Sequence, residues 1–468
     1  MIKYLKGCDN MDFLAAARAY QTEMIQDLET LVNIPSLFDE KTIEDGAPFG
    51  LKLKEVLNKA LDIGKRDGFK IKNVDGYAGI IEYGTGDEAV GVLGHLDVVP
   101  VSNDWQHKPF NSTLENGILF GRGSADDKGP TIAAYYAIRL LKDANVTTNK
   151  RIQLILGCDE ETDMRGMVYF KNHEKIPVCG FVPDADFPVV YAEKGILDLS
   201  IIGHVSTVIK ELNAGQRPNI VIAEADVIVA GQPKEELFNF YLLSNNLTGN
   251  IETLKNMTKY HIQGVGAHGA RPYLGVNAAW HLINFVGSAY NDKFAQKTAY
   301  LLKDWMAGNL NNHINGVHMG FLSMNLGVVK IDNGDVNLTL NIRYPNDTCS
   351  EIVVSNIQKA FINNDYPLAI LILADNPPLF IDPESELITI LEKTYRKFSE
   401  DYFTPIRTMS GGTYARTLPN FAAYGPAFPT RQIPKNVGIA HEDDEGIEIE
   451  SLVLACAIYA DALYQLTR

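Results

Sequence analysis

The chain has 468 residues, of which 46% are hydrophobic and 21% are charged, a composition typical of globular proteins with a substantial core. This composition excludes a disordered chain, a collagen-like repeat and a disulfide-rich miniprotein. Asp and Glu (58) outnumber Lys and Arg (42), giving a formal net charge of −16. An acidic chain without basic blocks predicts that neither nucleic acid nor membrane is among its partners.

The cysteines and the start of the chain indicate where the protein works. Five cysteines are scattered without a Cys-x-x-Cys pair, which predicts reduced thiols in place of a disulfide framework. The first 36 residues carry charges throughout and lack the apolar run and cleavage site of a secretory signal. No stretch approaches the roughly 20 apolar residues of a membrane span. We therefore expect a cytoplasmic protein.

The first part of the chain alternates between helix and strand patterns. Apolar residues at helical spacing predict amphipathic helices over residues 12–32 and 48–66. From residue 77, short β-branched runs bounded by Gly and Pro alternate with helical patterns, as expected of buried strands. This alternation predicts an α/β fold with a mostly parallel central sheet and helices on both faces. In such sheets, functional side chains gather at the carboxyl ends of the strands.

Residues 196–383 follow a different pattern, with many strand-like runs around one strong helical segment at 277–290. Such a pattern predicts an inserted α+β domain, long enough for two lobes. The paired prolines of DNPPLF suit a linker, after which residues 384–468 return to the first pattern. We therefore predict a discontinuous α/β domain of residues 1–195 and 384–468, with an inserted domain of residues 196–383.

His95 and Asp97 form the first candidate site, at the end of the apolar run AVGVLGHLD. Residues i and i+2 of a strand face the same side. The carboxylate could hold the imidazole in one tautomer while its other nitrogen binds a metal. A polar strand end without function fits the pair equally well.

Acidic residues follow other predicted strands. Asp126 and Asp127 precede a helical pattern, where acids also complement the helix dipole. Residues 159–161 are three consecutive acids that repel one another unless a cation or a proton intervenes; an exposed turn is the alternative. Asp184 in FVPDADFP also fits a turn, and the acids after His441 are typical of a solvated loop.

The joint pattern favours a metal site. The candidate ligands are nitrogen and oxygen donors without a thiolate, which suits Zn²⁺ or Mn²⁺. They are His95, Asp126, Glu161, Asp184 and His441. Five ligands are enough for two ions that share one carboxylate, an arrangement that activates water for hydrolysis.

Seven segments extend this interpretation. In chain order they are HLDVVP, GRGSADDKGP, GCDEETD, FVPDADFPVVYAEKG, GVGAHGARPYLGVNAA, SGGTYAR and GIAHEDDE. Together they resemble the co-catalytic metallopeptidase family of aminoacylases, carboxypeptidases and carnosinases. The likeness is greatest to its bacterial PepV-type dipeptidases (Xaa-His and general dipeptidases), and it spans about residues 12–465.

The resemblance implies two divalent metal ions, Zn²⁺ in the first place and Mn²⁺ as the alternative. His95 and Asp184 would hold one ion, Glu161 and His441 the other, and Asp126 would bridge them. The bond between Asp126 and the residue after it resembles a non-proline cis peptide of the family.

The resemblance also assigns roles beside the metals. Asp97 would orient His95, and Glu160 would be the general base. Neighbours on a regular strand face opposite sides, so we expect Glu160 and Glu161 just past the strand end.

The inserted domain would be a lid over the catalytic domain. Its His268 would stabilise the oxyanion, and Arg343 would bind the substrate carboxylate. Further substrate contacts are implied for Asn219, Gly411, Gly412 and Thr413.

The expected activity is hydrolysis of short unmodified peptides, with a small peptide as the partner molecule. An N-acyl amino acid deacylase of the same family is one alternative, and a non-catalytic binding homologue is the other. A lid of about 185 residues is long enough to cover the site alone, so we expect a monomer.

Overall fold

The computed structural model describes residues 11–468, which form two compact units. Unit 1 comprises the chain up to Tyr191, Ile381–Arg407 and Gly412–Arg468, and unit 2 comprises Ala192–Phe380 and Thr408–Gly411. The boundaries expected from the sequence, after residues 195 and 383, lie within four residues of these.

Residues 408–411 differ from the expectation, since the sequence placed them in the discontinuous domain and the structure groups them with unit 2. Hydrogen bonds explain the difference: Lys194 N donates to Met409 O, and Arg343 Nη1 donates to Ser410 O.

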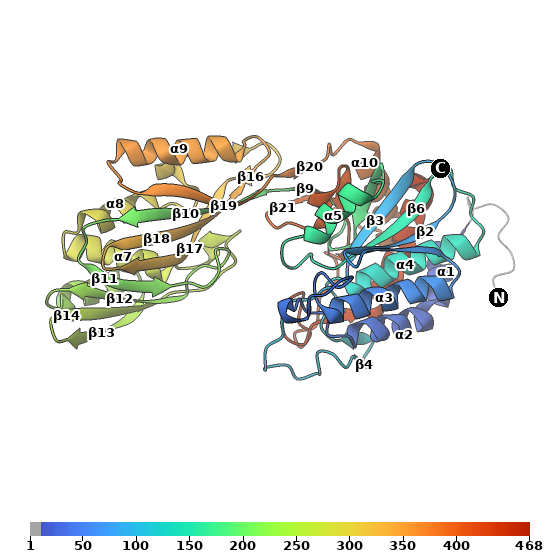
Figure 1. Cartoon of the computed structure of the whole chain (residues 1–468), viewed down its shortest axis with the longest axis horizontal. Helices are drawn as coiled ribbons and strands as arrows, with labels where there is room; N and C mark the ends of the chain where they lie inside the picture. Colours follow the sequence, from blue (N-terminus) through green and yellow to red (C-terminus); the bar gives the residue numbers. More distant parts are fainter. Residues whose placement is uncertain (1–10) are drawn as a thin grey trace. The chain divides into compact units, whose positions relative to one another are not determined.

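A mixed sheet forms the centre of unit 1 (Figure 1). Its strands β6, β3, β7 and β22 are parallel, and antiparallel strands flank them on both sides. In spatial order the strands are β1 (Lys70–Val74), β2 (Ala78–Tyr83), β6 (Arg151–Gly157), β3 (Ala89–His95), β7 (Cys179–Val182), β22 (Phe421–Ala423) and β9 (Val190–Glu193). Shorter strands of unit 1 are β4 (Thr113–Glu115), β5 (Ile118–Phe120), β8 (Ala185–Asp186), β23 (Pro426–Ala427) and β24 (Gly446–Glu448). By residue number β20 (Leu379–Phe380) falls in unit 2, and β9 and β21 (Arg407–Met409) run across the boundary between the units. The predicted α/β fold with a mostly parallel centre is confirmed.

Elements cover both faces of this sheet. Gly79 of β2 lies against Leu57 of helix α3 (Leu51–Arg66), and Gly94 of β3 lies against Thr131 of helix α4 (Lys128–Asp143). Gly157 of β6 lies instead against Tyr414, in the turn of 3₁₀ helix Tyr414–Thr417. Because side chains alternate along a strand, α3 and α4 share one face and the turn with Tyr414 lies on the other.

Seven α-helices are described in unit 1: α1 (Phe13–Ala19), α2 (Gln21–Val32), α3 (Leu51–Arg66), α4 (Lys128–Asp143), α5 (Arg165–His173), α10 (Glu386–Ser399) and α11 (Ile449–Leu466). The sequence predicted one helix over residues 12–32, but the structure divides it at Tyr20. The hydroxyl of Tyr20 donates to Asp143 Oδ2, 2.7 Å away. This contact places Tyr20 against α4 where the two helices meet.

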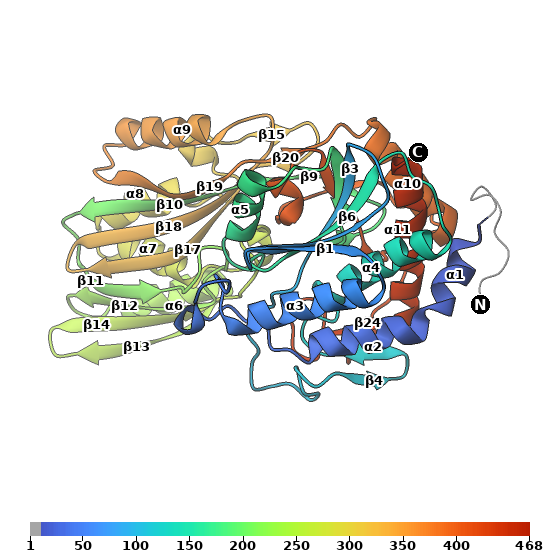
Figure 2. The same cartoon turned by 45° about the vertical axis from the view of Figure 1, so that its right-hand side comes forward.

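Helix α11 is the core helix of unit 1. By length and composition alone this 18-residue helix could cross a membrane, but 89% of it is buried inside the structure. A helix with apolar residues all around its surface is typically buried on all sides. Figure 2 shows α11 packed among α1, α4 and α10.

Unit 2 contains one antiparallel eight-stranded sheet. In spatial order its strands are β13 (Thr248–Leu254), β14 (Met257–Gln263), β12 (Glu224–Ala230), β11 (Ile209–Ala214), β17 (Ser323–Asp332), β18 (Asp335–Tyr344), β10 (Gly195–His204) and β19 (Ala369–Asn376). The helices are α6 (Glu235–Ser244), α7 (Ala278–Ala289), α8 (Lys293–Leu301) and α9 (Ser350–Asn363), and a short hairpin pairs β15 (Asn315–Gly316) with β16 (Gly320–Phe321). Alternate strand residues such as Leu197 and Leu199 join all four helices in one hydrophobic cluster.

The cysteines in the described part of the chain are all free: Cys158, Cys179, Cys349 and Cys456. Cys8 lies outside the described residues.

Candidate active site

The structure gathers the predicted metal ligands and Glu160 in unit 1, at the carboxyl edge of the parallel strands. His95 is the last residue of β3, and the chain reaches Glu160 shortly after β6 and Asp184 shortly after β7. Parallel strands end at the same edge of a sheet, which brings these three side chains together. Asp126 arrives from the loop before α4, and His441 from the loop before β24.

Asp126 lies between the two histidines. Its Oδ1 is 2.9 Å from His95 Nε2, and its Oδ2 is 3.0 Å from His441 Nε2. His441 Nε2 is also 3.1 Å from Glu161 Oε1. The side chain of Asp126 therefore has one oxygen for each histidine, as a bridging ligand requires.

The second nitrogen of His95 faces residue 97. His95 Nδ1 is 3.0 Å from the backbone oxygen of Asp97 and 3.5 Å from its Oδ1. The carbonyl is therefore the closer partner, a detail that the strand pattern could not predict because β3 ends at His95. The other carboxylate oxygen, Asp97 Oδ2, accepts the backbone N–H of Glu161 at 2.9 Å. Asp97 thus connects the β3 and β6 ends.

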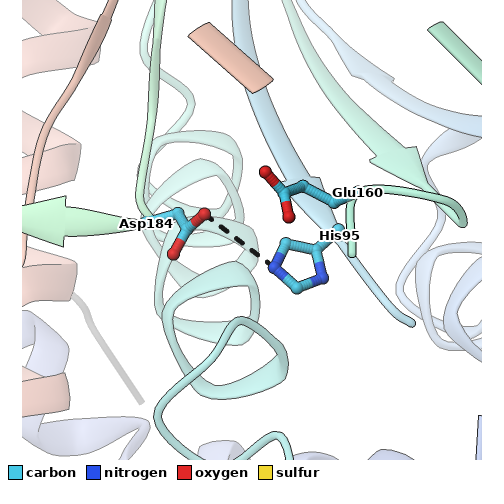
Figure 3. Close-up of side chains that lie close together, drawn as sticks. All are labelled: His95, Glu160 and Asp184. Carbon is cyan, nitrogen blue, oxygen red and sulfur yellow. Dashed lines mark ion pairs between the residues drawn. The ribbon is translucent and has the colours of Figure 1, made fainter. Parts of the chain in front are cut away.

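Asp184 lies near the same nitrogen of His95 as Asp126, with its Oδ2 3.9 Å from Nε2, and Glu160 lies close to both. In Figure 3, the side chains of Glu160, Asp184 and His95 point toward one another. The donor atoms of these three residues lie within 4.8 Å of one another, and the same holds for the set of His95, Asp126 and Glu161. Glu160 is therefore close enough to be a ligand as well as a base, which the resemblance did not imply.

Two further expectations are confirmed. The bond between Asp126 and Asp127 is a cis peptide. Glu160 and Glu161 both lie beyond β6, which ends at Gly157.

Negative charge is concentrated in this cluster. Burial raises the pKa of Glu160, and nearby Glu161 adds to the rise, while His95 opposes it. Burial also raises the pKa of Asp184, and the charge of Asp126 raises it further. Like charges and low dielectric both favour the protonated carboxyl. A bound cation would remove the same repulsion.

The histidines are shifted toward their charged form. Hydrogen bonds to Asp126 and Glu161 raise the pKa of His441 to about 10. Burial lowers the pKa of His95, but the bonds to Asp126 and Asp97 outweigh it and raise the pKa well above its usual value. Each imidazole thus lies where the surrounding carboxylates favour a positive charge. The imidazole nitrogens and carboxylate oxygens of the cluster are ligands that suit a borderline divalent ion. The residues fit a pair of such ions.

Asp159 is a supporting residue that the sequence did not single out. It is 1% exposed, and its Oδ2 accepts from Arg165 N (2.8 Å) and Nε (2.9 Å). Its own N–H donates to the hydroxyl of Tyr414 at 3.1 Å. The first of the three consecutive acids is therefore neutralised by an arginine, and it fixes the loop that carries Glu160 and Glu161.

Replacing Asp159 by alanine should lower the free energy of unfolding by about 1.5–3 kcal/mol, since hydrogen bonds to a charged group are lost. Asp163→Ala is the matched control, because Asp163 lies on the same loop with its side chain 74% exposed; its effect should stay within about 0.5 kcal/mol. Urea unfolding of chelator-treated protein measures both. Equal midpoints for the two variants would contradict this role of Asp159.

The predicted substrate contacts in unit 2 form two groups. Arg343 is 4% exposed; its Nε donates to Asn341 Oδ1 (2.9 Å) and its Nη1 to Ser410 O (3.1 Å). Asn341 in turn donates to Asp198 Oδ1 at 2.6 Å. The guanidinium is therefore held in place, and it lies beside the segment that contains Gly411.

His268 and Asn219 form the second group. Gly269 N donates to Asn219 O at 2.7 Å, and Ile220 forms an isolated bridge with His268. The structure thus brings together two positions that are 49 residues apart in sequence.

Gly412 and Thr413 belong to unit 1, because the segment of unit 2 that contains Gly411 ends at that residue. Thr413 is 3% exposed, and its hydroxyl accepts from Ala415 N at 3.1 Å. This bond caps the 3₁₀ turn that presents Tyr414.

Comparison with known proteins gives the relationship. Residues 91–465 match the model of "Peptidase family M20/M25/M40". The "Putative dipeptidase YtjP" of Bacillus subtilis is 33% identical over 462 residues, covering 95% of this chain and 97% of that protein. The "Putative dipeptidase" of Staphylococcus epidermidis is 32% identical over 465 residues, covering 96% of this chain and 97% of that protein.

Solved structures share the fold. Human carnosine dipeptidase 1 has a TM-score of 0.56 at 14% identity, covering 97% of this chain and 98% of that one. The family resemblance drawn from the seven segments is therefore confirmed: the chain belongs to peptidase family M20/M25/M40.

Proposed function

We propose that the protein is a two-metal dipeptidase that hydrolyses short peptides with free ends. The observation that carries this proposal is the gathering of His95, Asp126, Glu160, Glu161, Asp184 and His441 at one sheet edge. Relatives described as dipeptidases match almost the whole chain, which supports a peptide as the substrate.

The proposed ligands divide into two sets around Asp126. His95 and Asp184 would hold one ion, since His95 Nε2 and Asp184 Oδ2 are 3.9 Å apart. Glu161 and His441 would hold the other. Mixed nitrogen and oxygen donors favour Zn²⁺ over Mn²⁺ in affinity.

Glu160 is the proposed base and acid. When bound, the two cations supply Lewis acidity that polarises the scissile carbonyl and the attacking water. Glu160 would take a proton from that water and later give it to the leaving amine. Burial raises the pKa of Glu160, and a raised pKa helps a carboxyl hold the transferred proton until the leaving amine takes it up.

The residues of unit 2 are proposed to recognise the ends of the peptide. Arg343 would pair with the terminal carboxylate, which a fixed guanidinium binds through two parallel hydrogen bonds. His268 would donate to the carbonyl oxygen as negative charge develops on it. Asn219, Gly411, Gly412 and Thr413 are proposed to contact the substrate around these two groups.

A hydrolysis screen tests the proposal. Purified protein with Zn²⁺ or Mn²⁺ is offered unmodified dipeptides, N-acetylated amino acids and longer peptides under equal conditions. We expect dipeptides to be cleaved fastest. Preferential cleavage of acetylated amino acids would show a deacylase, and absence of any metal-dependent hydrolysis would leave only a binding role.

Arg343→Gln should lower kcat/KM for dipeptides about 10–100-fold, because a charged hydrogen bond is worth about 1.5–3 kcal/mol. Dipeptide amides, which lack the terminal carboxylate, serve as the control substrate. For the wild type, kcat/KM should be lower for the amide than for the dipeptide by a similar factor. With the amide as substrate, Arg343→Gln should reduce kcat/KM little further. Equal relative losses on both substrates would contradict carboxylate binding by Arg343.

We also propose that the protein acts as a monomer, with His268 serving its own chain. A mixture of inactive Glu160→Gln and His268→Ala chains should then stay at background activity, because no assembly contains a complete site. Substantial recovery on mixing, together with a dimer mass by light scattering, would show instead that the histidine crosses between subunits.

A further inference from the structure

A buried ion pair lies beside the metal-ligand cluster in unit 1. Arg122 Nη1 is 2.6 Å from Glu445 Oε2, and the two residues are 2% and 0% exposed. They are 323 positions apart in sequence. Burying two charges is costly, and such pairs are weak evidence for added stability, so the neighbours of the pair indicate its role.

Glu445 holds the backbone of the loop that carries Asp126. Its Oε1 accepts three N–H groups, from Gly123 (3.0 Å), Ala125 (2.8 Å) and Asp126 (3.1 Å). Converging backbone N–H groups of this kind form a site for an anionic oxygen. The position of Asp126 is thereby tied to a carboxylate on another segment.

Arg122 holds the loop that carries His441. Its Nη2 donates to the backbone oxygen of His441 at 3.3 Å. His441 has a positive φ of 69° and a side chain that is 55% exposed. A non-glycine residue in this conformation is held there by its surroundings, and its carbonyl is fixed by Arg122.

The acids after His441 fix the same loop elsewhere. Asp443 Oδ2 accepts from Ser102 Oγ at 2.6 Å, and Asp444 Oδ1 accepts from His107 N at 2.7 Å. Asp444 is only 8% exposed. The acidic run whose pattern is typical of a solvated loop is therefore bonded to two other segments of unit 1, residues 102–107 and residues 122–126.

We infer that the Glu445–Arg122 pair is a positioning device that sets the separation between Asp126 and His441. This inference rests on the proposed metal centre. Asp126 and His441 would be two of the three ligands of one ion, with Glu161 as the third. Loss of the pair should therefore lower the affinity for that ion more than the affinity for the ion held by His95 and Asp184.

Metal titration of the chelator-treated protein tests the inference by calorimetry with Zn²⁺. Glu445→Gln keeps the shape of the side chain but loses the ion pair. It should weaken binding of one ion about 10–100-fold, the usual cost of losing a partner that orients a ligand. Arg122→Lys keeps the positive charge beside Glu445 but loses the hydrogen bond from Nη2 to His441 O. It should therefore lower the affinity for the same ion. This second variant carries the test if Glu445→Gln does not fold.

Asp27→Asn is the matched control. Asp27 is 6% exposed and accepts from Arg66 through both oxygens (2.8 Å each) and from Tyr136 at 2.7 Å. Arg66 is half exposed, so this ion pair is buried on the Asp27 side only. Losing it should destabilise unit 1 while leaving both Zn²⁺ affinities unchanged.

Three outcomes separate the alternatives. Weakening of one ion in the Glu445 and Arg122 variants, but not in Asp27→Asn, supports the inference. Wild-type affinities in both variants, or equal weakening in the control, overturn it while the proposed function stands. A wild type that binds no ion refutes the proposed metal centre itself.

Discussion

Glu160→Gln is expected to lower kcat for dipeptide hydrolysis about 10²–10⁴-fold, the usual contribution of a positioned general base. Glutamine has nearly the same shape but cannot accept the proton of the attacking water. Metal content should stay at two ions per chain. Steady-state kinetics and elemental analysis of the same sample measure the two quantities.

The metal content decides between two roles for Glu160. Its carboxylate lies within ligand distance of His95 and Asp184, so a ligand and a base are both within reach by geometry. Loss of one ion in Glu160→Gln would show that it is a ligand, and near-normal kcat would contradict the base assignment. Asp163→Asn, on the exposed part of the same loop, should keep wild-type kcat and both ions.

The sequence could predict which strand ends carry the site. The run before His95 is apolar throughout, and β3 is buried at every position. Such runs identify buried parallel strands, whose carboxyl ends share one edge. The acids after β6 and β7 could therefore be placed near His95 without knowledge of any distance.

The supporting contacts could not be predicted in the same way. Glu445 and Arg122 are separated by 323 positions, and nothing in the pattern HEDDE distinguishes a buried acid from a solvated one. The closer Asp159–Arg165 pair could not be predicted either, because nothing in three consecutive acids shows which one faces the arginine. The one feature of the sequence at this place is Arg122 itself, a long charged side chain between two glycines in GRGSADDKG.

Local geometry also decides details that periodicity misses. The helical pattern continues across residue 20, but the hydroxyl of Tyr20 bonds to Asp143 and the helix divides there. The placement of residues 408–411 with unit 2 depends on single hydrogen bonds, from the Lys194 backbone N–H to Met409 O and from the Arg343 side chain to Ser410 O. Such contacts involve distant segments, so no local pattern encodes them.

Removal of divalent metal is expected to abolish hydrolysis, and Zn²⁺ or Mn²⁺ is expected to restore it. The physical reason is the charge of the cluster: the carboxylates of Asp126, Glu160, Glu161 and Asp184 lie together, and burial raises the pKa of the last three. A cation that pairs with these groups should also stabilise the fold. At 1,000 times the dissociation constant, one bound ion adds about 4 kcal/mol to the free energy of unfolding.

The choice of restoring ion tests the donor set. Mg²⁺ and Ca²⁺ prefer oxygen ligands and bind imidazole poorly, so at matched concentration they should restore little activity and raise the melting temperature less than Zn²⁺. Asp126→Asn is the matched variant, since it keeps the size of the side chain but removes the charge between the two histidines. It should regain neither activity nor melting temperature at Zn²⁺ concentrations that saturate the wild type. Full activity after exhaustive dialysis against chelator, with metal absent by elemental analysis, would refute the metal centre, because the cluster would then act through its carboxylates and imidazoles alone.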